Sequence, residues 1–284
     1  MTEFNSTSDA YKYIYNLSLK ESSFRYRGQA SFGWSLMPSI HRYTRLHRYQ
    51  TVKHEEFLML QKPKEPNPPL THTTYDLEWL MLCQHHGIPT RLLDWSSDIL
   101  IGLLFACSDK SKMNDDGALF ICNMLDYPTY TFDEPLKEEQ NLSFASTSVT
   151  NPRMRTQSGS FMIWGLSPLS NDSKESYDLW QYLKNTKEDS FLEKIRIPKA
   201  SKRRILYELS EIYSITMDSI YLKSGFIEKN FGKSFLELKE NLRLMTLYQT
   251  DADRLTKEEE IKARNFFSVE CRNMYHRTIS LSKY

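Results

Sequence analysis

The chain has 284 residues, of which 40% are hydrophobic, enough to form one large folded domain or two small ones. A formal net charge of +1 excludes a protein that binds polyanions through its overall charge, although local basic patches remain open. The longest apolar run, ILIGLLFAC, is far shorter than the ~20 residues that span a bilayer. The amino terminus also lacks the basic start and apolar run of a signal peptide, so we expect a soluble cytoplasmic protein with no membrane contact.

In chain order, the first half of the sequence favours helices around one strand. Helical spacing of apolar residues predicts a helix over 9–20, and SSFRYRGQA alternates large and charged residues as a strand does. HEEFLMLQK predicts a second helix, which ends at the proline-rich segment 62–69. A third helix is predicted over 73–85, with acids near its start.

The next segment changes conformation at a proline. Pro89 fixes its own φ and disfavours the α region for Ile88, so HGIPTRLLDW is not helical throughout. SSDILIGLLFACS predicts a helix capped by Ser96 or Ser97, with Asp98 in the first turn. Because its apolar residues nearly encircle it, this helix should be buried.

The remaining patterns place strands in the middle of the chain and helices after them. Strands are predicted at 117–125, 142–149, 159–166 and 191–198, followed by a helix with Ser201 at its cap and a charged, helical stretch over 216–284. Strands clustered in this way favour an α+β fold over a doubly wound α/β fold.

The stretch QHHGIPTRLLDWSSD holds the most chemistry. His85 and His86 are adjacent and have no further ligands at metal spacing, so we expect no metal site. Two interpretations of Arg91 and Asp94 stay open. They form either a structural ion pair beneath Trp95 or a loop whose arginine binds a phosphate or carboxylate.

Two other stretches carry candidate ligand-binding groups. In FRYRGQ, strand alternation places Arg25 and Arg27 on one face, and Gly28 would let a ligand approach the backbone. Gln157 precedes the predicted strand that begins at Gly159, so its amide is a candidate for a cleft. There is no Walker loop, HExxH, GxSxG or paired zinc-binding cysteine motif.

Together, YRGQ, WSLMPSIHR, QHHGIPTRLLDWSSD, GALFI and RMRTQSGSFMIWG resemble the FRG-domain family, over roughly residues 20–225. The departures are mild, with Ser96 where the family often has Thr and Thr156 where it often has Ala. The resemblance implies an FRG domain over 1–225. Residues 226–284 lie outside the resemblance, and their charged, helical pattern predicts a helical carboxy-terminal extension.

A second, weaker resemblance is to the ADP-ribosyltransferases, whose fold is a split mixed or antiparallel sheet flanked by helices. It implies NAD as co-substrate, with Arg27, Asp94 and Gln157 catalytic. Arg27 would hold phosphate or ribose oxygens, and Gln157 would bond the ribose 2′-hydroxyl where the family usually has Glu. Because glutamine is no general base, a carboxylate such as Asp94 would assist.

The same resemblance supplies the cofactor-binding residues. Tyr26 or Trp95 would stack on the nicotinamide ring, the Gly28 backbone would hold its amide, and Arg91 would hold the pyrophosphate. The residues that complete this set are Gln29, Thr90 and Ser96.

Basic and aromatic residues interleave in HRYTRLHRYQ, residues 41–50, and again over 264–277. Such stretches can follow a phosphate backbone and stack on bases, which favours RNA, then DNA, over a protein as acceptor. By analogy, a compact transferase suggests a bacterial toxin or phage-defence effector with an antitoxin partner. Two alternatives remain: a metal-independent RNA nuclease using His86 and Asp94, and a non-catalytic module in which Arg91 and Asp94 are buried against each other.

Overall fold

The structure is a computed structural model. It describes residues 1–17, 23–43, 48–60, 62, 75–85, 87–131, 135–137, 142–145, 159–163, 165, 178–186, 191–221, 240–241, 243–244, 247 and 252–265. Its helices are α1 (Thr7–Leu17), α2 (Ser39–Tyr43), α3 (Arg48–Leu60), α4 (Asp76–His85), α5 (Ile99–Cys107), α7 (Leu179–Thr186), α8 (Lys199–Tyr213), α9 (Met217–Ile220), the 3₁₀ turns Lys110–Lys112, Met124–Asp126 and Ala252–Arg254, and a helix over 257–265.

The described strands form one mixed, mostly antiparallel sheet, in the order β4-β5-β6-β2-β1-β3-β7. The strands are β1 (Phe24–Gln29), β2 (Leu93–Ser96), β3 (Gly117–Asn123), β4 (Thr129–Tyr130), β5 (Ser143–Ala145), β6 (Gly159–Ile163) and β7 (Leu192–Ile197). Among the described strands, β4 and β5 form a parallel pair, and an isolated parallel bridge joins Glu3 to Arg196 of β7. The α+β prediction is confirmed, and so are the strands expected in the middle of the chain.

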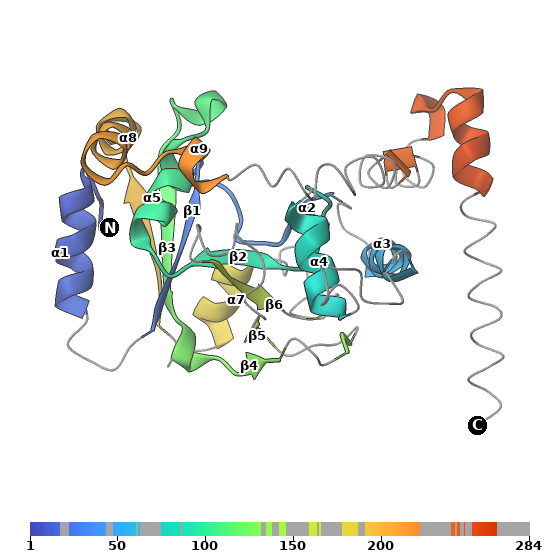
Figure 1. The fold of residues 1–284 in the computed structure, drawn as a ribbon, viewed down its shortest axis with the longest axis horizontal. Helices are drawn as coiled ribbons and strands as arrows, with labels where there is room; N and C mark the ends of the chain where they lie inside the picture. The colour runs from blue at the N-terminus through green and yellow to red at the C-terminus, as the bar shows by residue number, and fades with distance from the viewer. Residues whose placement is uncertain are drawn as a thin grey trace.

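The sheet consists of two halves that meet at a single point. β1 pairs with β3 along its whole length, and β2 pairs with β6 at four positions. Between β1 and β2, the register is a single pair, Tyr26 opposite Ser96. Figure 1 shows the result, because β1 and β3 run steeply while β2 and β6 lie across them. Beyond this pair the two halves diverge.

Three clusters of buried apolar residues cover the two faces. One face is continuous across both halves, since Trp95 of β2 and Phe120 of β3 belong to the same cluster, which α7 covers through Leu179. The other face is divided between two groups of helices. Helices α5 and α8 pack on β1, β3 and β7, whereas α3 and α4 pack on the other half. In Figure 1, β2 runs between these two groups of helices.

A glycine allows α5 to lie directly on β1. A Cβ atom at Gly28 would stand 1.9 Å from the carbonyl oxygen of Gly102 and 2.5 Å from the amide nitrogen of Ala106, both backbone atoms of α5. Burial of α5 on nearly every side confirms the prediction from its apolar residues. Gly28 is therefore required by the contact between helix and strand, where we had expected it to admit a ligand.

Two predicted helix caps are wrong. Asp98, not Ser96 or Ser97, caps α5, and its Oδ1 accepts a hydrogen bond of 2.8 Å from the amide of Leu100. Ser96 ends β2, a short strand that the sequence pattern around Pro89 did not predict. At α8, the cap is Pro198, and Ser201 lies inside the helix, where its hydroxyl donates to Asn5 Oδ1 at 2.6 Å.

Two of the cysteines lie in the core. Cys83 and Cys107 carry free thiols inside the core, and burial raises the pKa of both. No helix in the described ranges is long and apolar enough to cross a membrane. The proposed boundary at residue 225 stays a prediction, because the structure describes only short pieces of the chain after Tyr221.

Candidate functional site

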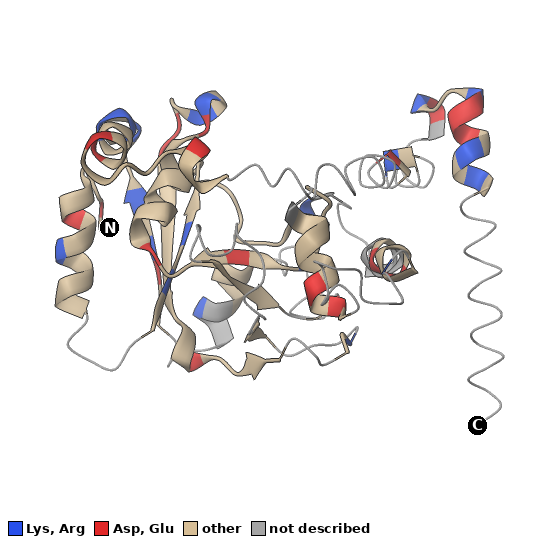
Figure 2. Cartoon of the chain, in the orientation of Figure 1, with Lys and Arg blue, Asp and Glu red and all other residues tan. Residues whose placement is uncertain are grey.

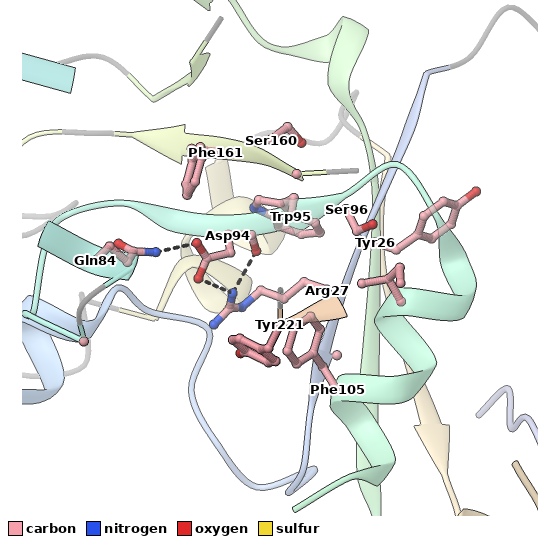
Figure 3. A pocket seen from close by; sticks show the side chains of 14 residues that line it. Tyr26, Arg27, Gln84, Asp94, Trp95, Ser96, Phe105, Ser160, Phe161 and Tyr221 are labelled. Atoms are coloured by element: carbon pink, nitrogen blue, oxygen red, sulfur yellow. Dashed lines mark hydrogen bonds and ion pairs between the residues drawn. The ribbon is translucent and has the colours of Figure 1, made fainter. Parts of the chain in front are cut away.

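A pocket of about 420 Å³ opens where the two halves of the sheet part. Its walls come from β1, β2 and β6 and from the facing ends of α4 and α5 (Figure 3). This volume is within the range of small-molecule sites, roughly 300–1,000 Å³. The lining residues are Tyr26, Arg27, Gly28, Gln84, Gly87, Asp94, Trp95, Ser96, Ile101, Phe105, Gly159, Ser160, Phe161 and Tyr221.

The main charged groups of the pocket are Arg27 and Asp94. They stand 67 positions apart in the chain, and the crossing of β1 and β2 brings them together. Arg27 Nη1 donates a hydrogen bond of 2.7 Å to the backbone carbonyl of Asp94 and lies 3.7 Å from Asp94 Oδ2. The Asp94 side chain is 59% exposed, whereas that of Arg27 is 14% exposed, so the carboxylate faces the open pocket.

A short chain of hydrogen bonds orients the Asp94 carboxylate. Thr90 Oγ1 donates to Gln84 Oε1, and Gln84 Nε2 donates to Asp94 Oδ1. Thr90 is itself fixed, because its amide donates to Ser39 Oγ at 3.0 Å. The side-chain amide of Gln84 therefore accepts a hydrogen bond through its oxygen and donates one through its nitrogen. Thr90, which we expected to touch a cofactor, acts on the pocket through Gln84.

The surrounding protein shifts the pKa values of Arg27 and Asp94 in the directions that favour their uncharged forms. Burial lowers the pKa of Arg27 to about 10, and the nearby carboxylate of Asp94 opposes that shift. The same surroundings raise the pKa of Asp94, while Arg27 and the Gln84 amide act in the opposite direction. Arg27 Nε is buried and has no hydrogen-bond partner in the described part of the chain. The site therefore holds a cationic arginine with one N–H group, at Nε, that no described residue accepts.

Phe105 and Tyr221 form an aromatic wall of the pocket, and neither is among the predicted site residues. Phe105 of α5 and Tyr221, which follows α9, meet edge to face with centroids 6.4 Å apart. Tyr221 is 43% exposed, whereas Tyr26 and Trp95 are only 6% and 3% exposed. Figure 3 shows the rings of Phe105 and Tyr221 below the Arg27 side chain. A planar ligand would therefore stack on Tyr221 and Phe105 rather than on Tyr26 or Trp95.

Arg91 does not pair with Asp94, and that prediction is wrong. Its guanidinium is 1% exposed and forms a two-pronged ion pair with Glu55 of α3, in which Nε donates to Oε2 at 2.6 Å. Arg91 Nη1 also donates to the carbonyl of Lys137 at 2.6 Å. The side chains of Arg91 and Asp94 leave the chain on different sides, so Arg91 anchors the loop to α3 and does not line the pocket.

Three further predicted residues have structural partners. Gly28 lines the pocket and contacts α5. Ser96 also lines it, and its hydroxyl accepts a hydrogen bond of 3.0 Å from the amide of Asp98. Gln29 is not among the lining residues, since its Nε2 donates to the carbonyl of Ser35 at 3.2 Å.

Some predicted residues lie outside the part that the structure describes. Gln157 and His86 are among them, and so are 44–47 of the first basic stretch and 266–277 of the second. Within the described residues, no group of three or more His, Cys, Asp and Glu side chains lies close enough to hold a metal ion.

Gln84 is the missed residue that the sequence could have indicated. It lies four positions after Leu80 and three after Met81, so helical spacing puts it on the same face as these two apolar residues. A polar residue on such a face needs a partner once it is buried. Phe105 and Tyr221 gave no comparable signal, because aromatic residues are frequent throughout this chain.

Residues 22–115 match the model of the FRG domain, a span from β1 to the turn after α5 that contains Arg27, Gln84, Asp94 and Phe105. The match is narrower than the predicted resemblance over 20–225, and β6 and Tyr221 lie beyond it. No curated protein and no solved structure matches the chain, so no comparison links it to an ADP-ribosyltransferase. This protein therefore carries an FRG domain, and that domain supplies both members of the Arg27–Asp94 pair.

Proposed function

We propose that the pocket binds NAD and that the protein transfers ADP-ribose to a macromolecular acceptor, with RNA favoured over DNA and protein. One observation carries the proposal. Arg27 and the Asp94 carboxylate lie together where β1 and β2 part, next to the aromatic wall of Phe105 and Tyr221. The partly divided sheet also supports a likeness to the split sheet of ADP-ribosyltransferases, which is part of the proposal.

Arg27 would hold oxygen atoms of the pyrophosphate or ribose. One of its nitrogens already donates to the Asp94 carbonyl, which fixes the guanidinium in place. The unpartnered Nε supplies a donor that no described residue uses. Since the pKa of Arg27 falls only to about 10, the side chain stays charged at neutral pH. A fixed cation with an unused donor suits an anionic ligand.

The ring of nicotinamide would stack on Tyr221 and Phe105. Tyr221 is the exposed ring of this pair, and stacking of offset aromatic rings contributes about 0.5–1.5 kcal/mol beyond the buried area. A nicotinamide ring stacked on Tyr221 and Phe105 would lie next to Arg27, which would leave the bond between nicotinamide and ribose near the Asp94 carboxylate (Figure 3).

In the proposed reaction, the bond between the nicotinamide nitrogen and ribose C1′ breaks and nicotinamide leaves with the bonding electrons. A nucleophilic oxygen of the acceptor then bonds to C1′ and gives its proton to Asp94. The carboxylate also opposes the positive charge that develops on the ribose. The surrounding protein desolvates the Asp94 carboxylate and raises its pKa, although part of the side chain faces the open pocket, and a carboxylate of raised pKa is a better proton acceptor than an ordinary one. Gln157 keeps its predicted role of bonding the 2′-hydroxyl.

The cellular role is a further part of this proposal. A transferase that modifies RNA in the cytoplasm would act as a bacterial toxin or phage-defence effector. Its antitoxin would cover the mouth of the pocket, where Tyr221 is exposed. This step rests on analogy with such systems.

The test is incubation of purified protein with NAD labelled in the adenosine half, with and without total cellular RNA. We expect label in RNA, nicotinamide release, and loss of both by at least about 100-fold in Asp94→Asn and Arg27→Gln, the size of effect typical of a proton-transfer residue. Glu211→Gln and Arg203→Gln on the exposed face of α8 are the matched controls. Tyr221→Ala should raise the KM for NAD, and Tyr207→Ala, which removes a 68% exposed ring, should not.

Nicotinamide release without labelled macromolecule would mean hydrolysis in place of transfer. Wild-type protein that neither binds nor turns over NAD would overturn the proposal.

A further inference from the structure

A second, smaller pocket lies against the first. It encloses about 170 Å³ and shares Arg27, Gln84, Gly87 and Asp94 with the larger pocket. The rest of its wall is different, since it comes from α2 and the segment 88–93. The Arg27–Asp94 pair therefore lines both pockets.

Arg42 of α2 adds a second cation to this smaller pocket. It is exposed and forms no hydrogen bond or ion pair with a described residue. Arg42 and Arg27 face a single carboxylate, that of Asp94, so two positive charges meet one negative charge. One positive charge is left over, and the pocket lining contains no other acidic residue.

This excess is local. Figure 2 shows acidic and basic residues interspersed over the drawn helices and strands, in agreement with a net charge of +1. At about 170 Å³, the smaller pocket is below the roughly 300–1,000 Å³ of small-molecule sites and has room for a phosphate group with a few waters.

We propose that the smaller pocket holds a backbone phosphate of a single-stranded RNA acceptor, bound by Arg42 and Arg27. This inference rests on the proposed transfer. If nicotinamide occupies the larger pocket, the acceptor oxygen must approach ribose C1′ opposite the leaving group, and its phosphate must bind next to the NAD site rather than in it. The smaller pocket adjoins the larger one at Arg27 and Asp94. Arg42 belongs to the interleaved basic and aromatic stretch 41–50, which gives this stretch a defined contact.

A single phosphodiester carries one negative charge and matches the one unpaired positive charge. Each phosphate neutralised on a single strand adds about 0.7 to the slope of log K against log salt. A charge-assisted hydrogen bond contributes about 1.5–3 kcal/mol, so loss of this contact should weaken binding by roughly tenfold or more.

The experiment measures binding of a short, mixed-sequence single-stranded RNA by fluorescence anisotropy over a range of salt, without NAD. We expect Arg42→Gln to weaken RNA binding about tenfold and to lower the salt slope by about 0.7. Arg203→Gln is the control for loss of one surface arginine, and it should change neither value. NAD binding to Arg42→Gln, measured by calorimetry, should stay within about twofold of wild type, since Arg42 is not among the residues that line the larger pocket.

Equal RNA affinity and salt slope in Arg42→Gln and Arg203→Gln would overturn the inference. So would weaker NAD binding with unchanged RNA binding, because the pocket would then hold the pyrophosphate of NAD. Unchanged RNA affinity with weaker binding of an acidic peptide would assign the pocket to a protein acceptor instead. Failure of the wild-type protein to bind NAD would sink the proposed transfer, yet the RNA measurement would still decide whether Arg42 binds phosphate.

Discussion

The glycine of the YRG sequence offers the sharpest test of the fold. In Gly28→Ala, the added Cβ would lie 1.9 Å from Gly102 O and 2.5 Å from Ala106 N. Ordinary contacts begin near 3.4 Å, and both opposing atoms belong to the α5 backbone, so no rotamer change relieves the clash. The helix must move away from β1 and disturb core residues such as Leu103, which is 0% exposed.

Overpacking of a core costs about 1–3 kcal/mol, and a clash between backbones belongs at the upper end of that range. For a chain of this size, 3 kcal/mol lowers Tm by about 6–12 °C. The matched control is Gly33→Ala, whose Cβ would meet nothing closer than Ser31 Oγ at 4.0 Å. We expect this control to change the free energy of unfolding by less than about 0.5 kcal/mol.

Thermal and urea unfolding of both variants, with NAD binding measured in parallel, decides between the two roles of Gly28. A Gly28→Ala protein as stable as Gly33→Ala would refute the packing argument. If that stable variant also lost NAD, the ligand-approach interpretation of Gly28 would replace it.

Three further predictions follow from the contacts around the pocket. Glu55→Gln should destabilise the fold by about 3–5 kcal/mol in urea unfolding, because it removes the charge that pairs with the buried Arg91 guanidinium. The double variant Glu55→Leu/Arg91→Met should recover much of that loss. A Glu55→Gln protein as stable as wild type would contradict the pairing. Burial lowers the pKa of His54 to about 4, below its ordinary 6.5, so the unfolded chain binds more protons and stability should fall as pH drops from about 6.5 towards 4. His54→Gln keeps a donor for the Pro89 carbonyl and should flatten this part of the Tm-against-pH curve, and an unchanged curve would exclude His54 as the cause. Gln84→Ala should reduce NAD turnover about tenfold or more and shift the pH profile of turnover, with Tm nearly unchanged. Gln84→Glu places a second carboxylate beside Asp94 and should raise the pH at which activity appears. Identical pH profiles of wild type and both variants would show that Gln84 does not act on Asp94.

Local patterns in the sequence determined much of the fold. Strand alternation in FRYRGQ separates Arg25 and Arg27 from Phe24 and Tyr26, and the structure adds that Phe24 and Tyr26 pack in the cluster that contains α5. The apolar run of α5 determined its burial in the same way. The resemblance to the FRG family followed from short contiguous sequence motifs, and the match over residues 22–115 confirms an FRG domain there.

The tertiary structure alone decided which groups meet. In the sequence, Arg91 and Asp94 stand three residues apart and invite pairing, yet Arg91 reaches Glu55 of α3, and Asp94 receives Arg27 from β1. The reason is that Asp94 lies on a strand, where neighbouring side chains take opposite faces, while Arg91 lies in the loop before it. The single register pair between Tyr26 and Ser96 opens the pocket, and Tyr221 closes one wall from a distant part of the chain. Such contacts depend on how two halves of a sheet cross, and no local period in the sequence encodes that angle.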